Sequence, residues 1–531
     1  MMTHASRMVV GAVLIFAVAG CLVGPDYAKP DLAMPDQWNA PLENGEQEGT
    51  PQVVQWWRSF GDAQLDSLVE RALAANFDLR VAESRILEAR AAESLTEADL
   101  WPAINASAAY KRIQNQKPAS PSSDFAVSGA SATLSRQGAS VAATVLPVGA
   151  GGPSVTIAPD FTGAGGSRVT VGSPQGGASG LKRRTDLYQG GFDASWELDL
   201  FGGTRREAEA AQAQREAAEE NRRDIQVSLS AEVARQYFSL RRAQASLDIA
   251  AKNIELQRDT LGLVQSRFDA GLTSELDVQN ATAQLAVTEA SVPGYAAEVQ
   301  YAIHRLGVLL GGGPGLLQEE LGPVVALPAA PPEVPVGLPA DLLRRRPDVR
   351  RAERELAAST ALIGAATADL FPKVSLTGSF TGQDDALYGI KRNANMMWSI
   401  GPGIRWPVFD AGRVRANIRI RNARQEQALT AYEKAVMTSL EDVENALVAY
   451  AKEQNRLLSL EKAVEANTSA VAIANDLYTQ GLVSFLSVLE AERSLAATEV
   501  QHLQSRAAVL THLTALFKSL GGGWNEAEAS Y

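Results

Sequence analysis

Residues 413–480 contain neither proline nor glycine and are rich in Ala, Leu, Glu, Arg and Gln. Those side chains lose little rotamer freedom in a helix, so this composition predicts one continuous helix. At 1.5 Å per residue the helix would be roughly 100 Å long, far beyond an ordinary globular helix. Gly481 ends the run, and a second apolar-periodic segment follows it to Leu520. The chain is therefore expected to fold around very long helices joined by a glycine turn.

An earlier segment of the chain repeats this pattern. A shift of 210 positions places Gly481 on Gly271, and 10 of the 19 positions that begin at each glycine are identical. A shift of 270 positions aligns residues 77–107 with 347–377, where 9 of 31 are identical. Such self-similarity indicates a duplicated fold. The expected fold class is α+β, and each half runs helix, strand, strand, long helix, glycine turn, helix.

The first 20 residues have the pattern of a signal peptide. Arg7 precedes a 13-residue apolar run at 8–20, which is shorter than the roughly 20 residues that a membrane-spanning helix needs. Cys21, the only cysteine in the chain, follows Val-Ala-Gly. This order is similar to the lipobox of bacterial lipoproteins, whose cysteine is diacylated and becomes the mature N-terminus. We expect Cys21 to carry the lipid and Leu22 to favour the outer membrane; a chance cysteine at the end of a signal peptide is the alternative.

Composition argues against several classes of protein. The formal net charge is −12 and no basic run occurs, which argues against nucleic-acid binding. The four histidines lack metal-ligand spacing, and the sequence shows no nucleophile–base pair or nucleotide-binding loop. We therefore expect no enzymatic activity, no metal and no cofactor. No apolar segment reaches 18 residues, so a transmembrane helix is not expected.

Four segments alternate apolar and polar residues. The clearest are residues 374–380, 192–200 and 398–408, and residues 104–110 follow the pattern more weakly. Period 2 over about ten residues, with aromatic residues near the ends, fits transmembrane strands with a lipid-facing and a lumen-facing side. A half-buried soluble sheet would show the same alternation. The membrane interpretation is favoured because the sequence provides no partner domain to cover the apolar faces.

Four strands are too few for a transmembrane barrel, because such barrels begin at about eight strands. An open sheet edge in lipid would leave backbone groups unpaired, which is costly. If the strands span a membrane, several chains must contribute them to one barrel. The sequence alone leaves two, three or four chains open.

The predicted boundaries follow from these elements. Residues 21–75 are expected to be irregular before the first repeat, although a helical run begins near residue 62 and continues to about residue 100. The remaining segments are a first repeat at 76–311, a proline-rich linker at 312–340, a second repeat at 341–523 and a tail at 524–531. The first repeat carries about 60 extra residues, 116–182, which are low in charge and dense in small residues. We predict a flexible loop there, with short strands near 141–146 and 168–171.

Three motifs occur together in this chain. They are Gly24-Pro-Asp-Tyr after the lipobox, Leu342-Leu-Arg-Arg-Arg-Pro-Asp-Val-Arg-Arg-Ala-Glu, and Ala368-Asp-Leu-Phe-Pro-Lys-Val-Ser-Leu-Thr-Gly. Their combination resembles the TolC-type outer-membrane efflux family, in its NodT lipoprotein branch, over residues 21–523. The resemblance implies a homotrimer whose twelve strands form one β-barrel in the outer membrane, with a long α-helical barrel in the periplasm. It also implies two partners, a periplasmic adaptor (membrane-fusion) protein and an inner-membrane efflux pump.

The resemblance also assigns roles to the glycine turns. In the family these turns are periplasmic tips that the adaptor contacts, and they correspond here to Gly271, Leu272, Thr273, Ser274, Gly481, Leu482, Val483 and Ser484. The family closes its periplasmic mouth with two acidic rings, whose positions correspond to Ser487 and Glu490, so one ring is missing. Tyr478 and Asp277 match a latch pair, but the latch arginine corresponds to Val483. The alternative for each residue is a solvated helix charge or a packing aromatic.

The leading hypothesis for function is a passive trimeric channel that carries drugs or other small molecules from pump and adaptor to the outside. An outer-membrane duct for type I protein secretion has the same architecture and is the main alternative. A structural lipoprotein that tethers the envelope is less consistent with the strands, because a tether needs no barrel. The sequence does not identify the substrate, because the pump usually selects it.

Overall fold

The computed structural model describes residues 22–40, 46–47, 54–114, 155–156, 170–171, 184–331, 334–384 and 395–524. The predicted signal peptide, Cys21 and most of the 116–182 insertion lie outside these residues. The chain divides into two compact units. The first comprises Ser94–Ala208 and Ile363–Arg419 with the segment up to Pro25, and the second comprises Asp26–Glu93, Glu209–Leu362 and Ile420–Tyr531. Each unit therefore contains parts of both repeats, so the units do not coincide with the two halves of the sequence.

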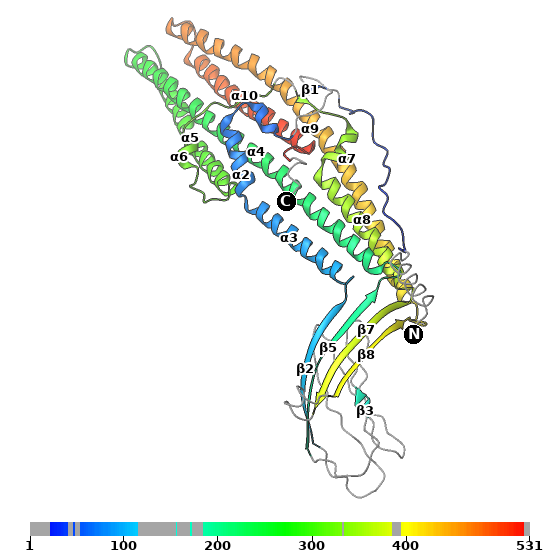
Figure 1. Cartoon of the computed structure of the whole chain (residues 1–531). Coiled ribbons are helices and arrows are strands. Elements are labelled where there is room, and N and C mark those ends of the chain that lie inside the picture. The colour runs from blue at the N-terminus through cyan, green and yellow to red at the C-terminus, as the bar shows by residue number, and fades with distance from the viewer. Residues whose placement is uncertain are drawn as a thin grey trace, which may run out of the picture. The chain divides into compact units, whose positions relative to one another are not determined.

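A four-stranded antiparallel sheet in the order β2-β5-β7-β8 forms the centre of the first unit (Figure 1). Its strands are β2 (Ala103–Gln114), β5 (Arg184–Leu198), β7 (Lys373–Asp384) and β8 (Asn395–Arg405). All four predicted strands are confirmed. Strands β8 and β5 end earlier than the alternation suggested. β8 ends at Arg405, before Pro407, which has no amide hydrogen to donate to the ladder. β5 ends at Leu198, because the next residue, Asp199, accepts hydrogen bonds from the first turn of the following helix.

The sheet has one apolar and one polar face. One row of directly paired residues crosses all four strands as Ala106, Phe192, Phe380 and Trp398. The adjacent row, on the opposite face, is Asn105, Asp193, Ser379 and Ser399. In that polar row Asn105 Nδ2 donates to Asp193 Oδ2 over 3.3 Å, and the Ser379 and Ser399 hydroxyls lie 2.8 Å apart. Within the described chain, β2 and β8 each pair on one side only.

The helices confirm the duplication through their lengths. The long helices α4 (Gly203–Asp269) and α9 (Arg413–Thr479) each have 67 residues. Their antiparallel partners α5 (Glu275–Leu309) and α10 (Phe485–Ser519) each have 35 residues. The shorter helices α3 (Phe77–Ala98) and α8 (Pro347–Ala368) each have 22 residues. Figure 1 shows α4 turning back into α5 and α9 turning back into α10.

The same tertiary hydrogen bond recurs in both repeats. Trp196 Nε1 donates to the Leu100 carbonyl over 2.8 Å, and Trp406 Nε1 donates to the Leu370 carbonyl over 3.1 Å. The tryptophans are 210 positions apart and the carbonyls are 270 positions apart, which are the two shifts found in the sequence. The equivalence of the halves therefore extends from helix length to individual contacts.

The predicted helical run from residue 62 to residue 100 is two helices. They are α2 (Ala63–Ala75), which lies inside the stretch expected to be irregular, and α3. The break falls at Asn76, a buried residue. Its side chain accepts hydrogen bonds from the Asp78 and Leu79 amides and donates to the Leu309 carbonyl over 2.9 Å. Asn76 thus begins a new helix and binds the end of α5, which a continuous helix could not do.

The region between the repeats, predicted as a proline-rich linker, contains regular secondary structure. It contains the short helix α6 (Gln318–Leu321) and the strand β6 (Val334–Pro335), which pairs in parallel with β1 (Glu46–Gln47). Five apolar side chains between its prolines are buried in the main core of the second unit: Leu317, Leu321, Leu327, Val334 and Val336. Burial of these side chains, rather than the prolines, determines the path of this segment.

In the insertion, β3 (Val155–Thr156) pairs with β4 (Thr170–Val171). The strand predicted near 168–171 is therefore confirmed in part, whereas the one near 141–146 lies outside the described residues. Among the residues that the structure describes, no helix combines the length and the apolar character needed to cross a membrane.

Candidate functional site at the hairpin tips

The two helical hairpins end in matching glycine turns. Gly271 and Gly481 have φ angles of 72° and 77°, a left-handed conformation that costs glycine little. The Leu272 amide donates to the Arg267 carbonyl over 2.8 Å, and the Leu482 amide donates to the Leu477 carbonyl over 2.9 Å. Each turn is thus a Schellman motif, which satisfies the last carbonyls of the helix and reverses the chain.

The tips present apolar side chains to solvent. Leu272 and Leu482 are each 67% exposed, and the glycine before each of them is also exposed. Ser274 and Ser484 occupy the cap positions of α5 and α10. Val483 differs from its neighbours because its side chain is partly buried against an apolar cluster. Of the residues predicted to contact an adaptor, the exposed leucines therefore offer the most apolar surface.

Asp277 is engaged within its own turn. Its Oδ2 accepts hydrogen bonds from the Ser274 amide over 3.3 Å, from the Ser274 hydroxyl over 3.1 Å and from the Thr273 hydroxyl. This arrangement is a capping box at the start of α5. Burial alone would raise the pKa of Asp277, but the hydrogen bonds to its carboxylate hold the pKa below its usual value.

Tyr478 is buried at the end of α9, and it forms no hydrogen bond with Asp277. Its hydroxyl is buried and has no hydrogen-bond partner among the described residues. Its ring packs in a cluster with Val264, Phe485 and Val488, and the Phe485 ring centroid is 5.7 Å away. The described chain therefore does not join Tyr478 to Asp277, the latch pair that the resemblance implied.

Arg267 contacts Tyr478 instead, and sequence reasoning missed it. Its guanidinium lies over the Tyr478 ring, with the central carbon 4.7 Å from the ring centroid. Its Nη1 donates to the Tyr478 carbonyl over 3.1 Å and to the Thr479 carbonyl over 3.2 Å. A signal was available, because the 210-position shift places Arg267 on Leu477, so only the first half carries a cation there.

The predicted gate positions on α10 differ in environment from their neighbour Glu492. Ser487 and Glu490 are exposed on α10. Glu492 is only 5% exposed and accepts a hydrogen bond from the Thr260 hydroxyl of α4 over 2.9 Å. Burial raises the pKa of Glu492, and the bond from Thr260 opposes this only in part. Nothing in the spacing of these acids along the sequence distinguished the buried carboxyl from the exposed one.

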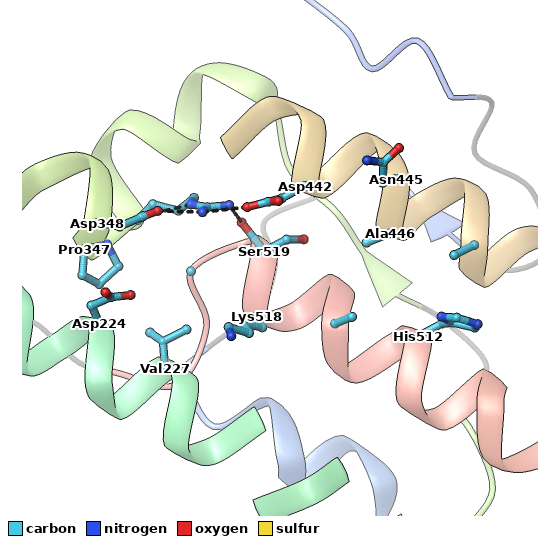
Figure 2. Close-up of a pocket in the computed structure, with 14 residues that line it drawn as sticks. Asp224, Val227, Pro347, Asp348, Asp442, Asn445, Ala446, His512, Lys518 and Ser519 are labelled. Atoms are coloured by element: carbon cyan, nitrogen blue, oxygen red, sulfur yellow. Dashed lines mark hydrogen bonds and ion pairs between the residues drawn. The ribbon is translucent and has the colours of Figure 1, made fainter. Parts of the chain in front are cut away.

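A cavity of about 420 Å³ lies elsewhere in the second unit, where α4, α8, α9 and α10 meet (Figure 2). The buried Arg346 donates to the carboxylates of Asp348 and Asp442 over 2.7 and 3.0 Å and to the Ser519 carbonyl over 3.2 Å. Burial alone would raise the pKa of Asp348, but Arg346 holds it below its usual value. Burial and the nearby Asp348 raise the pKa of Asp224. Arg346 thus ties three helices together through one charge.

Comparisons with known proteins identify the family. The outer membrane efflux protein family matches residues 158–312 and 338–522. The chain is 29% identical over 514 residues to Nodulation protein T of Rhizobium leguminosarum bv. trifolii, with 96% of each chain covered. It is 28% identical over 515 residues to the solvent efflux pump outer membrane protein SrpC of Pseudomonas putida, with 96% of this chain and 97% of that protein covered.

Solved structures agree with the sequence matches. The outer-membrane channel OprN superimposes with a TM-score of 0.78 at 37% identity, covering 95% of this chain and all of that one. CusC superimposes with a TM-score of 0.74 at 27% identity, covering 95% and 100%. These matches confirm the resemblance found in the motifs and the duplicated α+β fold. The chain belongs to the outer membrane efflux protein family.

Proposed function

We propose that this protein is a passive channel of the outer membrane, through which an efflux system exports small molecules or ions. The observation that carries the proposal is the two-faced sheet. Phe192, Phe380 and Trp398 lie in one row of its apolar face and are at least 46% exposed in the single chain. A soluble protein rarely leaves such an apolar face open to water. If the apolar face contacts lipid and the polar face contacts water, each set of side chains lies in a favourable environment.

The open edges of the sheet support a homotrimer. Strands β2 and β8 each have one unpaired edge within the described chain, and unpaired edges are costly in lipid. Pairing β8 of one copy with β2 of the next removes every edge only when the ring closes. Three copies give about twelve strands, above the eight or so that a barrel needs. The family resemblance favours three copies over two or four.

The helical hairpins extend the passage into the periplasm in this proposal. Helices of 67 residues reach roughly 100 Å at 1.5 Å per residue. Their exposed tips, at Leu272 and Leu482, would contact a periplasmic adaptor protein that connects the channel to an inner-membrane pump. Three copies of Glu490 near the axis would form one acidic ring that attracts cations, with Ser487 in place of a second ring. Cys21, outside the described residues, would carry the lipid anchor.

The names of the relatives limit the class of substance that is transported but do not identify the substance. Their names describe a solvent efflux pump, a toluene efflux pump and a cation efflux system. A channel of this kind carries what its pump delivers. Among the described residues, no group of His, Cys, Asp or Glu side chains is arranged to hold a metal ion. We therefore assign small molecules or ions as the cargo class.

Purified full-length protein tests the proposal directly. Native mass spectrometry is expected to give three chains, with two acyl chains on the mature N-terminal Cys21. Planar lipid bilayers containing the trimer are expected to show stepwise ion conductance that favours cations. Glu490→Gln is expected to weaken the cation preference and leave the trimer intact. A monomer, or a trimer that never conducts, would contradict the channel assignment.

A further inference from the structure

The tip contact of Arg267 points to a role beyond packing. We propose that Arg267 is the positioning residue that holds the tip of the second hairpin against the first hairpin within each chain and so keeps the passage narrow. This inference rests on the proposed channel function. It differs from the latch that the resemblance implied, because the cation comes from α4 and its acceptors are main-chain carbonyls of α9.

The contact is well suited to fix the end of α9. The last carbonyls of a helix lack partners within the helix and carry the negative end of its dipole. Tyr478 and Thr479 supply two of the last carbonyls of α9. The Tyr478 carbonyl already accepts from the Gly481 amide of the turn over 2.9 Å, and Arg267 Nη1 donates to both carbonyls, over 3.1 and 3.2 Å. The guanidinium also covers the buried Tyr478 ring. Arg267 thus combines charge-assisted hydrogen bonds with a cation–π contact on one residue.

The position of the contact determines what it restrains. Arg267 lies in the last turn of α4, and Tyr478 lies just before the turn at Gly481. The two residues are 211 positions apart, so the bond joins different hairpins. Displacement of the second tip away from α4 requires that both carbonyl bonds break.

The environment of Arg267 makes the contact reversible. Its side chain is half-buried, so the guanidinium can bind water when it leaves the carbonyls. The apolar cluster of Val264, Tyr478, Phe485 and Val488 behind it is buried and would resist separation by the hydrophobic effect. Because Val264 belongs to the first hairpin and the other three residues to the second, Arg267 and this cluster hold the two tips together, and Arg267 is the polar part of that contact.

Single-channel recording of the purified trimer tests the proposal. Arg267→Ala is expected to raise the open probability, and with it the mean conductance, by about tenfold, the scale expected for loss of a hydrogen bond from a charged donor. Arg267→Lys should recover part of the closure, because an ammonium group can donate to a carbonyl but lacks the planar fork. The matched control is Arg258→Ala, which removes an exposed cation of the same helix that pairs with Glu289 in the same hairpin.

Two variants of Tyr478 test the same contact from its other side. Tyr478→Phe keeps the ring face and loses only a hydroxyl that has no partner among the described residues, so conductance should stay at the wild-type level. Tyr478→Leu removes the ring face and should raise conductance as Arg267→Ala does. If Arg267→Ala does not assemble, these two variants still test whether the contact keeps the passage narrow. Equal conductance of Tyr478→Phe and Tyr478→Leu would then overturn the proposal.

The outcomes separate this inference from the channel assignment. If the wild-type trimer conducts and Arg267→Ala has the same open probability as Arg258→Ala, the proposed role of Arg267 is wrong, whereas the channel assignment is unaffected. A lower melting temperature for Arg267→Ala without a change in conductance does the same, because it shows a structural role only. A wild-type trimer that never conducts removes the basis of both proposals.

Discussion

Glu492 lies in an environment poorly suited to a charge. Its carboxyl group lies between α4 and α10 at 5% exposure and receives a hydrogen bond from the neutral Thr260 hydroxyl. Burial disfavours the ionised form and raises the pKa. The folded state therefore binds this proton more tightly than the unfolded chain does. The stability that Glu492 contributes is present below the unfolded pKa and is lost as the pH rises through the folded pKa.

The substitution Glu492→Gln is expected to increase thermal stability at neutral pH, because the amide can still accept from Thr260 without a buried charge. The melting temperature of the detergent-solubilised variant should therefore be higher than that of the wild type at neutral pH. The gain should shrink toward acidic pH, where wild-type Glu492 is protonated. Melting curves between acidic and neutral pH would check this difference.

The control for this prediction is Glu465→Gln, at an exposed position of α9. It makes the same chemical change without relieving burial, so the melting temperature should follow the wild type at every pH. If both variants shift together, or if Glu492→Gln is equally stabilising at acidic pH, the raised pKa of Glu492 does not govern stability.

At the scale of elements, the glycine turns set where the long helices end. Gly481 has a φ of 77°, and an L-residue pays about 1–2 kcal/mol to adopt a left-handed conformation. Gly481→Ala should therefore loosen the turn between α9 and α10. Hydrogen exchange of peptides that span the turn is expected to accelerate, while the body of α9 keeps its protection.

Gly262 provides the opposite case within α4. Among the residues that the structure describes, and apart from the adjoining residues and the backbone of the helix itself, no atom lies within 4 Å of the Cβ that an alanine would add there. Glycine inside a helix costs about 0.5–1 kcal/mol relative to alanine. Gly262→Ala is expected to slow exchange in its part of α4. Faster hydrogen exchange around position 262 in Gly262→Ala, or unchanged hydrogen exchange of the turn peptides in Gly481→Ala, would contradict this account of the two glycines.

Elements were predictable from the sequence where one local rule dominated. The absence of proline and glycine predicted α9, and the glycine turn predicted its end. The helix break at Asn76, the path of the linker and the contact of Arg267 depend on tertiary contacts and could not be predicted from local sequence. Asn76 splits a helical run because its side chain reaches α5, and the linker follows its path because its apolar residues are buried in the core of the second unit. Arg267 was missed because its acceptors are main-chain carbonyls 211 and 212 positions away.

At the scale of the whole molecule, the sheet divides its surroundings into two environments. Ile400 and Ser399 are consecutive residues of the edge strand β8 and belong to opposite faces. Ile400 is 69% exposed and pairs with Gly378, whereas Ser399 pairs with Ser379 and lies within hydrogen-bonding distance of its hydroxyl. If the apolar face meets lipid and the polar face meets the aqueous passage, one substitution at these two positions should have two different effects.

Arginine distinguishes the two faces. Ile400→Arg places a charge on the lipid side, where arginine near the membrane centre costs about 2–4 kcal/mol, so the amount of heat-resistant oligomer in outer-membrane fractions should fall. Ser399→Arg adds the same charge to the polar face, so assembly should continue and ion selectivity should shift toward anions. Equal loss of oligomer in both variants would show that charge is excluded from both faces. Normal assembly of Ile400→Arg would show that the apolar face does not contact lipid, because the added guanidinium would then have remained in water at no cost.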